Sequence, residues 1–307
     1  MLAMSQEIQA ARRLGVGASE VAAILGLDHW RGQHSVWLEK TGRAPPREDT
    51  EDTLFGKAAE GAAIKLYEHH TGAHVEKCGN FVHPKYKIAR ATPDGLVGDG
   101  KTLQVKCPRY GTGWGDSGTH DFPSKIWLQI TWEMSCAQRT SADVIALIGR
   151  SVSIYPDCPY DDELFLRILE PVERFWRDYV VADREPPLDG TRDTTEWLRA
   201  QYPTNANDAY IYDDSAEMRR LVADYATAKE QQKLAETRVS ELHNQLAARI
   251  GEAAGIEGSN YSVSFKTTKK VTFDYKAALA GLGVSEQALQ PYAKFSQYRT
   301  LRLNRCK

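Results

Sequence analysis

Residues 91–108 read ATPDGLVGDGKTLQVKCP, and this stretch decides the fold. Its Gly-Asp-Gly sequence provides a turn between two extended runs, which predicts a β-hairpin. Successive side chains of a strand point to opposite faces, so Gln104 and Lys106 share one face and Leu103 and Val105 share the other. The shared face of Gln104 and Lys106 is the geometric basis for a predicted site.

The residue types on this hairpin suit the hydrolysis of a phosphodiester. Divalent metal stabilises the attacking and leaving oxygens of that reaction, and a hard cation such as Mg²⁺ requires oxygen ligands. Asp94 supplies a carboxylate, Val105 a backbone carbonyl, and Lys106 a cation for the nucleophile or the developing charge. Glu60, in the middle of a helix predicted over 53–70, can add a second carboxylate. An ordinary surface hairpin is the alternative, because Pro-Asp-Gly is a common turn and exposed lysines are common on strands.

The segments around the hairpin predict a mixed α/β domain that ends near Val181. Ser19 is positioned to cap the first helix, and Gly26 to end it. The glycine-rich segment 111–124 predicts a functional or mobile loop, in which Trp114 is an exposed aromatic able to stack on a base. The expected helices cover 19–27, 33–41, 53–70, 124–138 and 160–180, and the expected strands lie within 80–84, 89–98, 102–107 and 142–158.

The composition changes after this domain. A linker is expected over 182–215, and a C-terminal extension over 216–307. Apolar residues at a 3.5-residue spacing predict one long helix over 216–250, packed on its own domain or self-associating as a coiled coil. A hairpin built from residues 260–267 and 269–275, a short helix over 276–282 and a basic, aromatic tail complete the extension.

Composition places the chain among ordinary globular proteins. It has 307 residues with 39 Lys and Arg against 41 Asp and Glu, so any nucleic-acid surface must be local. Its five cysteines form no C-x-x-C pair, which indicates a reducing compartment. No stretch approaches the length of a membrane span. We therefore expect a cytoplasmic protein that makes no membrane contact.

The chain resembles the phage lambda exonuclease family, the YqaJ-type viral recombinase branch of the PD-(D/E)XK nucleases. Four blocks carry the resemblance, in family order: the N-terminal block RRLGVGASEVAAILGLDHWRGQHSVWLEKTGR (12–43), the helix segment FGKAAEGAAIKLYEHHTG (55–72), the strand pair TPDG…LQVKCP and the block GWGDSGTHDFPSKIWLQITWEM (113–134). Together they cover about residues 10–181. The resemblance implies a PD-(D/E)XK core over 1–181, followed by the helical and small β extension.

The same resemblance implies an activity and its partners. It implies a Mg²⁺-dependent exonuclease, with Mn²⁺ as a substitute, that degrades the 5′ strand of linear duplex DNA and leaves 3′ single-stranded overhangs. Relatives of this kind form rings, so a homo-oligomeric ring, a trimer by resemblance, is expected to act on DNA ends. A single-strand annealing protein is the expected partner, in the cytoplasm of a bacterial host of a phage or prophage.

The resemblance also implies roles for individual residues. Asp94, the residue at 104 and the Val105 carbonyl are expected to bind metal, together with Glu60 as the helix carboxylate. Lys106 is the catalytic lysine. The remaining expected contacts are Gln129 near the scissile phosphate, Ser19 with Arg12 or Arg13 at the 5′-terminal phosphate, and Trp114 on a DNA strand.

Gln104 departs from the family pattern, which has Glu there. The glutamine is either native, with its amide oxygen as a neutral ligand, or an isosteric substitution that traps a substrate complex. Loss of one carboxylate weakens metal binding and turnover, since affinity depends on ligand charge. A catalytically weak or inactive DNA-end-binding module on the same fold is therefore the alternative function. An endonuclease of the wider superfamily is a third, disfavoured by the expected 5′-phosphate block.

Overall fold

The computed structural model describes residues 12–44, 49–206 and 209–294, together with 299, 301 and 303. The chain divides into two compact units, Met1–Gln201 and Tyr202–Lys307. Each unit is described by itself below.

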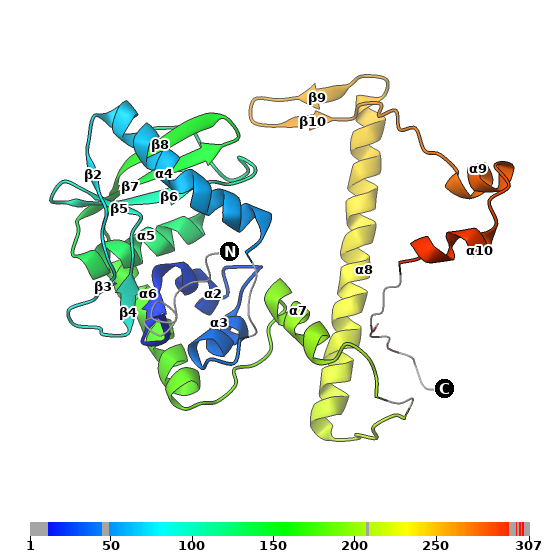
Figure 1. Cartoon of the computed structure of the whole chain (residues 1–307), viewed down its shortest axis with the longest axis horizontal. Coiled ribbons are helices and arrows are strands. Elements are labelled where there is room, and N and C mark those ends of the chain that lie inside the picture. Colours follow the sequence, from blue (N-terminus) through cyan, green and yellow to red (C-terminus); the bar gives the residue numbers. More distant parts are fainter. Residues whose placement is uncertain are drawn as a thin grey trace. The chain divides into compact units, whose positions relative to one another are not determined.

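A five-stranded mixed sheet forms the centre of the first unit (Figure 1), with the strand order β2-β5-β6-β7-β8. The central pair, β6 and β7, is parallel, with Gln104 opposite Val144 and Lys106 opposite Ala146. The other neighbours pair antiparallel, including the predicted hairpin β5–β6, in which Gly95 lies opposite Leu103. The bounds are β2 Val75–Glu76, β5 Gly95–Val97, β6 Lys101–Lys106, β7 Ser141–Ile148 and β8 Ser151–Pro159. A smaller sheet has the order β1-β4-β3, with β1 Val16–Gly17, β4 Ala89–Ala91 and β3 Phe81–Val82.

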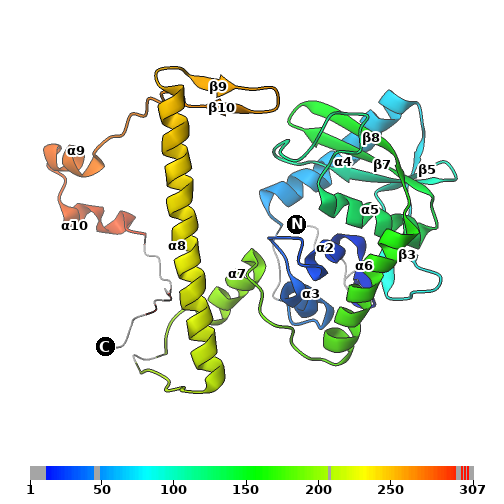
Figure 2. The same ribbon diagram turned by 180° about the vertical axis from the view of Figure 1, so that it is seen from behind.

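Two helices cover opposite faces of the central sheet, α4 (Glu51–Thr71) and α5 (Ser124–Ala137), as Figures 1 and 2 show. Strand alternation explains the division. Leu103 and Val105 of β6 belong to the apolar cluster on the α4 side, while the polar face with Gln104 is turned to α5. The predicted two faces of β6 are thus confirmed. The α5 side is closed by Ile126, Ile130 and Met134 against Ala142, Val144 and Ala146 of β7.

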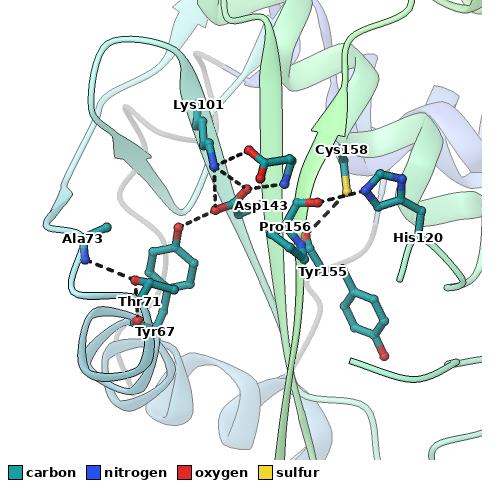
Figure 3. A network of polar contacts seen from close by, with 10 residues as sticks. Tyr67, Thr71, Ala73, Lys101, His120, Asp143, Tyr155, Pro156 and Cys158 are labelled. Carbon is teal, nitrogen blue, oxygen red and sulfur yellow. Dashed lines mark hydrogen bonds and ion pairs between the residues drawn. The ribbon is translucent and has the colours of Figure 1, made fainter. Parts of the chain in front are cut away.

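A polar network fixes α4 to the sheet (Figure 3). The Tyr67 hydroxyl donates a 2.5 Å hydrogen bond to Asp143 Oδ2, and Asp143 is buried. Lys101 Nζ lies 3.2 Å from Asp143 and 2.6 Å from Asp157, which brings β6, β7 and β8 into one ion-pair network. Burial raises the pKa of Tyr67 well above its ordinary value. Glu60 lies two helical turns from Tyr67 on the same helix. The Tyr67–Asp143 hydrogen bond therefore helps to fix the position of Glu60 relative to the sheet.

The N-terminal segment forms short elements around a buried ion pair. A 3₁₀ turn η1 (Ala18–Glu20) leads into α2 (Val21–Ile24), followed by α3 (Gln33–Lys40). Glu20 Oε2 accepts from the Gly17 amide at 2.7 Å and pairs with Lys40 Nζ at 2.5 Å. The capping role predicted for Ser19 is therefore wrong, because Glu20 provides the oxygen that holds this turn. Gly26, with φ +71°, stands where the helix was expected to end.

Three helical segments complete the first unit. Helix α6 (Asp162–Phe175) packs on α5 and continues as a π-helix, η2 (Trp176–Val181). Helix α7 (Arg192–Gln201) follows within the expected linker, and its Trp197 ring meets the buried His34 of α3 at 4.6 Å between centroids. The first unit therefore reaches past residue 181, since α7 packs back on α3. The expected bounds 1–181, 182–215 and 216–307 stay a prediction.

The second unit contains the long helix α8 (Ala216–Ile250), which begins with Ser215 accepting from Met218 N at 3.1 Å. Its hairpin pairs β9 (Gly255–Glu257) with β10 (Ser262–Ser264). The pairing predicted between 260–267 and 269–275 is wrong, because the first strand follows α8 directly and 265–274 forms no strand. The last elements are α9 (Tyr275–Gly281), α10 (Glu286–Leu289) and η3 (Gln290–Tyr292). Most of the basic tail lies outside the described residues.

The mixed α/β class predicted for the chain is confirmed by this architecture. Among the described residues, no helix is long and apolar enough to cross a membrane.

Candidate active site

Asp94 is held at the start of β5 by the neighbouring strand. Its backbone N–H donates to the Leu103 carbonyl at 3.1 Å, and its Oδ2 accepts from the Val105 amide at 2.6 Å. The Gln104 side-chain amide also donates to Oδ2. Gly95 follows because a Cβ there would collide with the Val75 side chain of β2. The sequence Pro-Asp-Gly thus fixes one carboxylate at the edge of the sheet.

Gln104, Lys106 and Gln129 form one hydrogen-bonded group. Gln129 comes from α5, and its Oε1 accepts from Lys106 Nζ at 2.8 Å. Its Nε2 donates to Gln104 Oε1 at 2.6 Å. The amide of Gln104 in turn donates to Asp94 and to the Val105 carbonyl at 3.1 Å. The structure therefore joins Asp94, Gln104, Lys106 and Gln129 in one continuous hydrogen-bonded network.

Glu133 is a member of this group that the sequence analysis missed. It lies one helical turn beyond Gln129, is 1% exposed, and accepts from Gln129 Nε2 at 2.8 Å through Oε1. Its Oε2 is buried without a hydrogen-bond partner among the described residues. One feature of the sequence could have pointed to this residue: Glu133 is the single acid in the α5 sequence SKIWLQITWEMSCA.

Burial dominates the electrostatics of these side chains. It raises the pKa of Asp94 to about 6. The hydrogen bond from the Val105 N–H and the charge of Lys106 oppose this shift, because both favour the charged carboxylate. It raises the pKa of Glu133 to about 8, with a further contribution from the charge of Asp94. Burial also lowers the pKa of Lys106, while Glu133 and Asp94 oppose that shift. Such shifts are typical of functional sites, where charged groups are brought together out of water.

A cavity of about 200 Å³ opens beside this group. Lys106 and Gln129 line it, and Lys125 stands one turn before Gln129 on α5. Ser19 lines the same cavity, so the structure brings this predicted residue to the predicted catalytic lysine. The other lining residues are Ala18, Ala22, Asp28 and Ile126.

The remaining predicted residues are placed as follows. Glu60 is exposed, and its charge contributes to raising the pKa of Asp94. Arg13 lies against Gly42, and the Arg12 carbonyl accepts from Lys40, so neither lines the cavity with Ser19. An Arg12 or Arg13 contact with a 5′-phosphate stays a prediction.

Trp114 differs from its expected exposure. The ring is half-buried and packs against Tyr155 at 5.6 Å and Phe122 at 6.2 Å between centroids. The expectation of an exposed ring is wrong, because the glycine-rich loop folds back on the α5 side of the sheet. A contact between Trp114 and a DNA strand stays a prediction.

The donor set fits a hard divalent cation. Asp94 receives its hydrogen bonds on Oδ2, and no described group bonds its Oδ1. The orphaned Glu133 Oε2 is a second buried carboxylate oxygen nearby, and Val105 adds a carbonyl. Within the described residues no three His, Cys, Asp or Glu side chains gather as a metal cluster, so amide and carbonyl oxygens would have to complete the ligand set.

Part of the chain is similar to a known domain family. Residues 7–140 match the family model of the YqaJ-like viral recombinase domain. The uncharacterized protein YqaJ of Bacillus subtilis (strain 168) is 29% identical over 272 residues, 86% of this chain and 84% of that protein. The resemblance stated from the sequence is confirmed.

Solved structures show the fold of this YqaJ-like chain. The crystal structure of LHK-Exo in complex with dAMP is 23% identical, covers 65% of this chain and 98% of its own, and superposes with a TM-score of 0.51. The alkaline exonuclease LHK-Exo from Laribacter hongkongensis, with the same identity and coverage, gives 0.50. The chain therefore shares its mixed α/β fold with these two structures over about two thirds of its length.

Proposed function

We propose that the YqaJ-like chain is a divalent-metal-dependent exonuclease that degrades linear duplex DNA from 5′ to 3′ and leaves 3′ single-stranded overhangs. One observation carries the proposal: Asp94, Gln104, Lys106 and Gln129 are linked by hydrogen bonds beside a cavity. Family and fold support the coarser assignment to phage-type exonucleases and recombinases. LHK-Exo is described as an alkaline exonuclease, which agrees with this class.

The predicted ligands for the cation are Asp94, the Gln104 amide oxygen, the Val105 carbonyl and Glu60, with Mg²⁺ as the expected ion and Mn²⁺ as a substitute. When bound, the cation supplies charge stabilisation at the scissile phosphate. The Gln104 NH₂ group donates to Asp94 in the structure. Ligation by its oxygen therefore requires the amide to turn about its last torsion.

Lys106 and Gln129 perform the remaining chemistry in this proposal. The Lys106 ammonium, held by Gln129 at 2.8 Å, orients the attacking water and stabilises the charge that develops on the phosphate. Ser19 and Lys125 line the cavity beside it and suit the terminal phosphate of a 5′ end. An end-binding cavity next to the cleavage group favours an exonuclease over an endonuclease.

A catalytically weak or inactive DNA-end-binding module is the second candidate. Gln104 favours it, since a neutral amide that donates to Asp94 stands where the family pattern has a carboxylate. Both candidates use the same cavity and the same DNA ends. A homo-oligomeric ring, an annealing-protein partner and a place in the cytoplasm of a phage host belong to the proposal by family resemblance.

The two candidates separate in one assay. Linear duplex with a 5′-phosphate and the matching closed circle are incubated with Mg²⁺, and acid-soluble nucleotide is measured. An exonuclease releases nucleotide from the linear DNA alone, and Asp94→Asn abolishes that release. Binding of the linear DNA without release supports the end-binding module, and cleavage of the circle contradicts both.

A further inference from the structure

Glu133 has an environment that a purely structural acid does not explain. Its carboxyl group is buried between α5 and the sheet, with one oxygen bonded to Gln129 at 2.8 Å and the other without a partner among the described residues. An unsatisfied buried polar atom costs about 1–3 kcal/mol, and more when the group is charged. A methionine of similar size would fill this position without that cost.

Glu133 and Gln104 accept hydrogen bonds from the same atom. The Nε2 atom of Gln129 donates to Gln104 Oε1 at 2.6 Å and to Glu133 Oε1 at 2.8 Å. The two side chains therefore converge on one nitrogen atom, although one comes from β6 and the other from α5. Gln104 is neutral and Glu133 is an acid, so the two positions together hold one carboxyl group. A chain with Glu at 104 and a neutral residue at 133 would hold the same number.

We propose that Glu133 supplies from helix α5 the second acidic group of the metal site that strand β6 lacks at Gln104. The inference rests on the proposed function, because it concerns the same cation. When the cation binds, it displaces the protons of these acids, so that Asp94 and Glu133 provide two negative charges from two elements, while the Gln104 amide and Val105 carbonyl contribute neutral oxygens. A hard divalent cation prefers this all-oxygen set, and its affinity depends on the number of charged ligands.

Two substitutions test the exchange of charge between the positions. Glu133→Gln keeps the size of the side chain and an oxygen that can accept from Gln129, but removes the charge. Gln104→Glu moves a carboxylate to β6 and leaves Glu133 untouched. The double variant Gln104→Glu/Glu133→Gln restores the original number of acids with their positions exchanged.

Binding of Mn²⁺ to the full-length protein without DNA is measured by isothermal titration calorimetry. The loss of a charged group is expected to raise the Kd of Glu133→Gln about tenfold or more, in the range known for groups that support a metal site. The double variant is expected to return to within about threefold of the wild type. Gln104→Glu alone binds at least as tightly as the wild type. Glu170→Gln, an exposed acid on α6, is the matched control and leaves the Kd unchanged.

Two results would overturn the inference. Unchanged Mn²⁺ affinity in Glu133→Gln shows that the carboxylate does not serve the metal. A double variant as weak as Glu133→Gln shows that Glu133 acts by holding Gln129 and not by its charge. DNA cleavage is scored separately: a wild type that binds Mn²⁺ in this pattern without cutting DNA contradicts the proposed function alone.

Discussion

The Nζ atom of Lys106 lies 2.8 Å from the Oε1 atom of Gln129, which joins the predicted hairpin to helix α5. The same Gln129 amide donates to Gln104 and Glu133, so one side chain orients both the predicted catalytic lysine and the groups at the proposed metal site. The central group thus depends on the packing of α5 against β6.

Gln129→Leu is expected to reduce the rate of cleavage about 10²-fold while DNA binding changes little, since it removes interactions that matter in the transition state. Single-turnover cleavage and a fluorescence binding assay separate the two quantities. Gln232→Leu on the exposed α8 is the matched control and retains the wild-type rate. An equal loss in both assays would instead indicate a binding role.

Lys125→Met is expected to reduce the preference for a 5′-phosphate over a 5′-hydroxyl end about tenfold, because an ammonium group then no longer lines the cavity. Ser19→Ala acts in the same direction. The preference is the ratio of kcat/KM for the two duplexes. Lys87→Met, an exposed lysine that bonds the Pro84 carbonyl, leaves the ratio unchanged. A ratio unaffected by both cavity variants would contradict the assignment of this cavity to the 5′ end.

The free energy of unfolding of the metal-free protein is expected to fall as the pH rises from about 4 to about 8. Burial raises the pKa of Asp94 from 3.8 to about 6 and that of Glu133 from 4.5 to about 8. The folded state then holds protons that the unfolded chain releases, so rising pH favours unfolding. Urea unfolding in the presence of EDTA measures the slope. Glu133→Gln is expected to remove most of this pH dependence between pH 6 and 8. If the free energy of unfolding changed with pH equally in wild type and variant, the prediction would be contradicted.

Tyr67→Phe is expected to destabilise the first unit by about 1–2 kcal/mol, because Asp143 loses one of its hydrogen bonds while its pairing with Lys101 remains. Urea unfolding provides the measurement. Tyr110→Phe, with a ring that is 70% exposed, is the control and stays within about 0.5 kcal/mol of the wild type. Equal stability of the two variants would show that the Tyr67–Asp143 hydrogen bond of Figure 3 contributes nothing to the stability of the fold.

Local pattern was sufficient for the hairpin and for its two faces. Alternation along β6 assigns Gln104 and Lys106 to one side, and the Gly-Asp-Gly turn pairs β5 with β6, without knowledge of the rest of the chain. The family blocks brought Gln129 to the same site. These predictions succeeded because strand geometry fixes side-chain direction over short distances.

Other features depend on contacts between distant residues. Glu133 resembles a solvated helix acid until α5 is packed on the sheet, which buries it. The Gly17 amide at the start of η1 is bonded by Glu20 and not by Ser19, and Lys40, from α3, holds the Glu20 carboxylate in place. The Trp114 ring is covered by Tyr155 of β8, which no local pattern indicates.

The most direct test of the nuclease assignment follows one strand of a duplex that carries a single 5′-phosphate. The two strands have different 3′ labels, and Mg²⁺ starts the reaction. We expect the phosphorylated strand to shorten from its 5′ end while the other strand stays full length, and Lys106→Met to prevent the shortening. Internal cuts, or shortening that persists in Lys106→Met, would contradict the account.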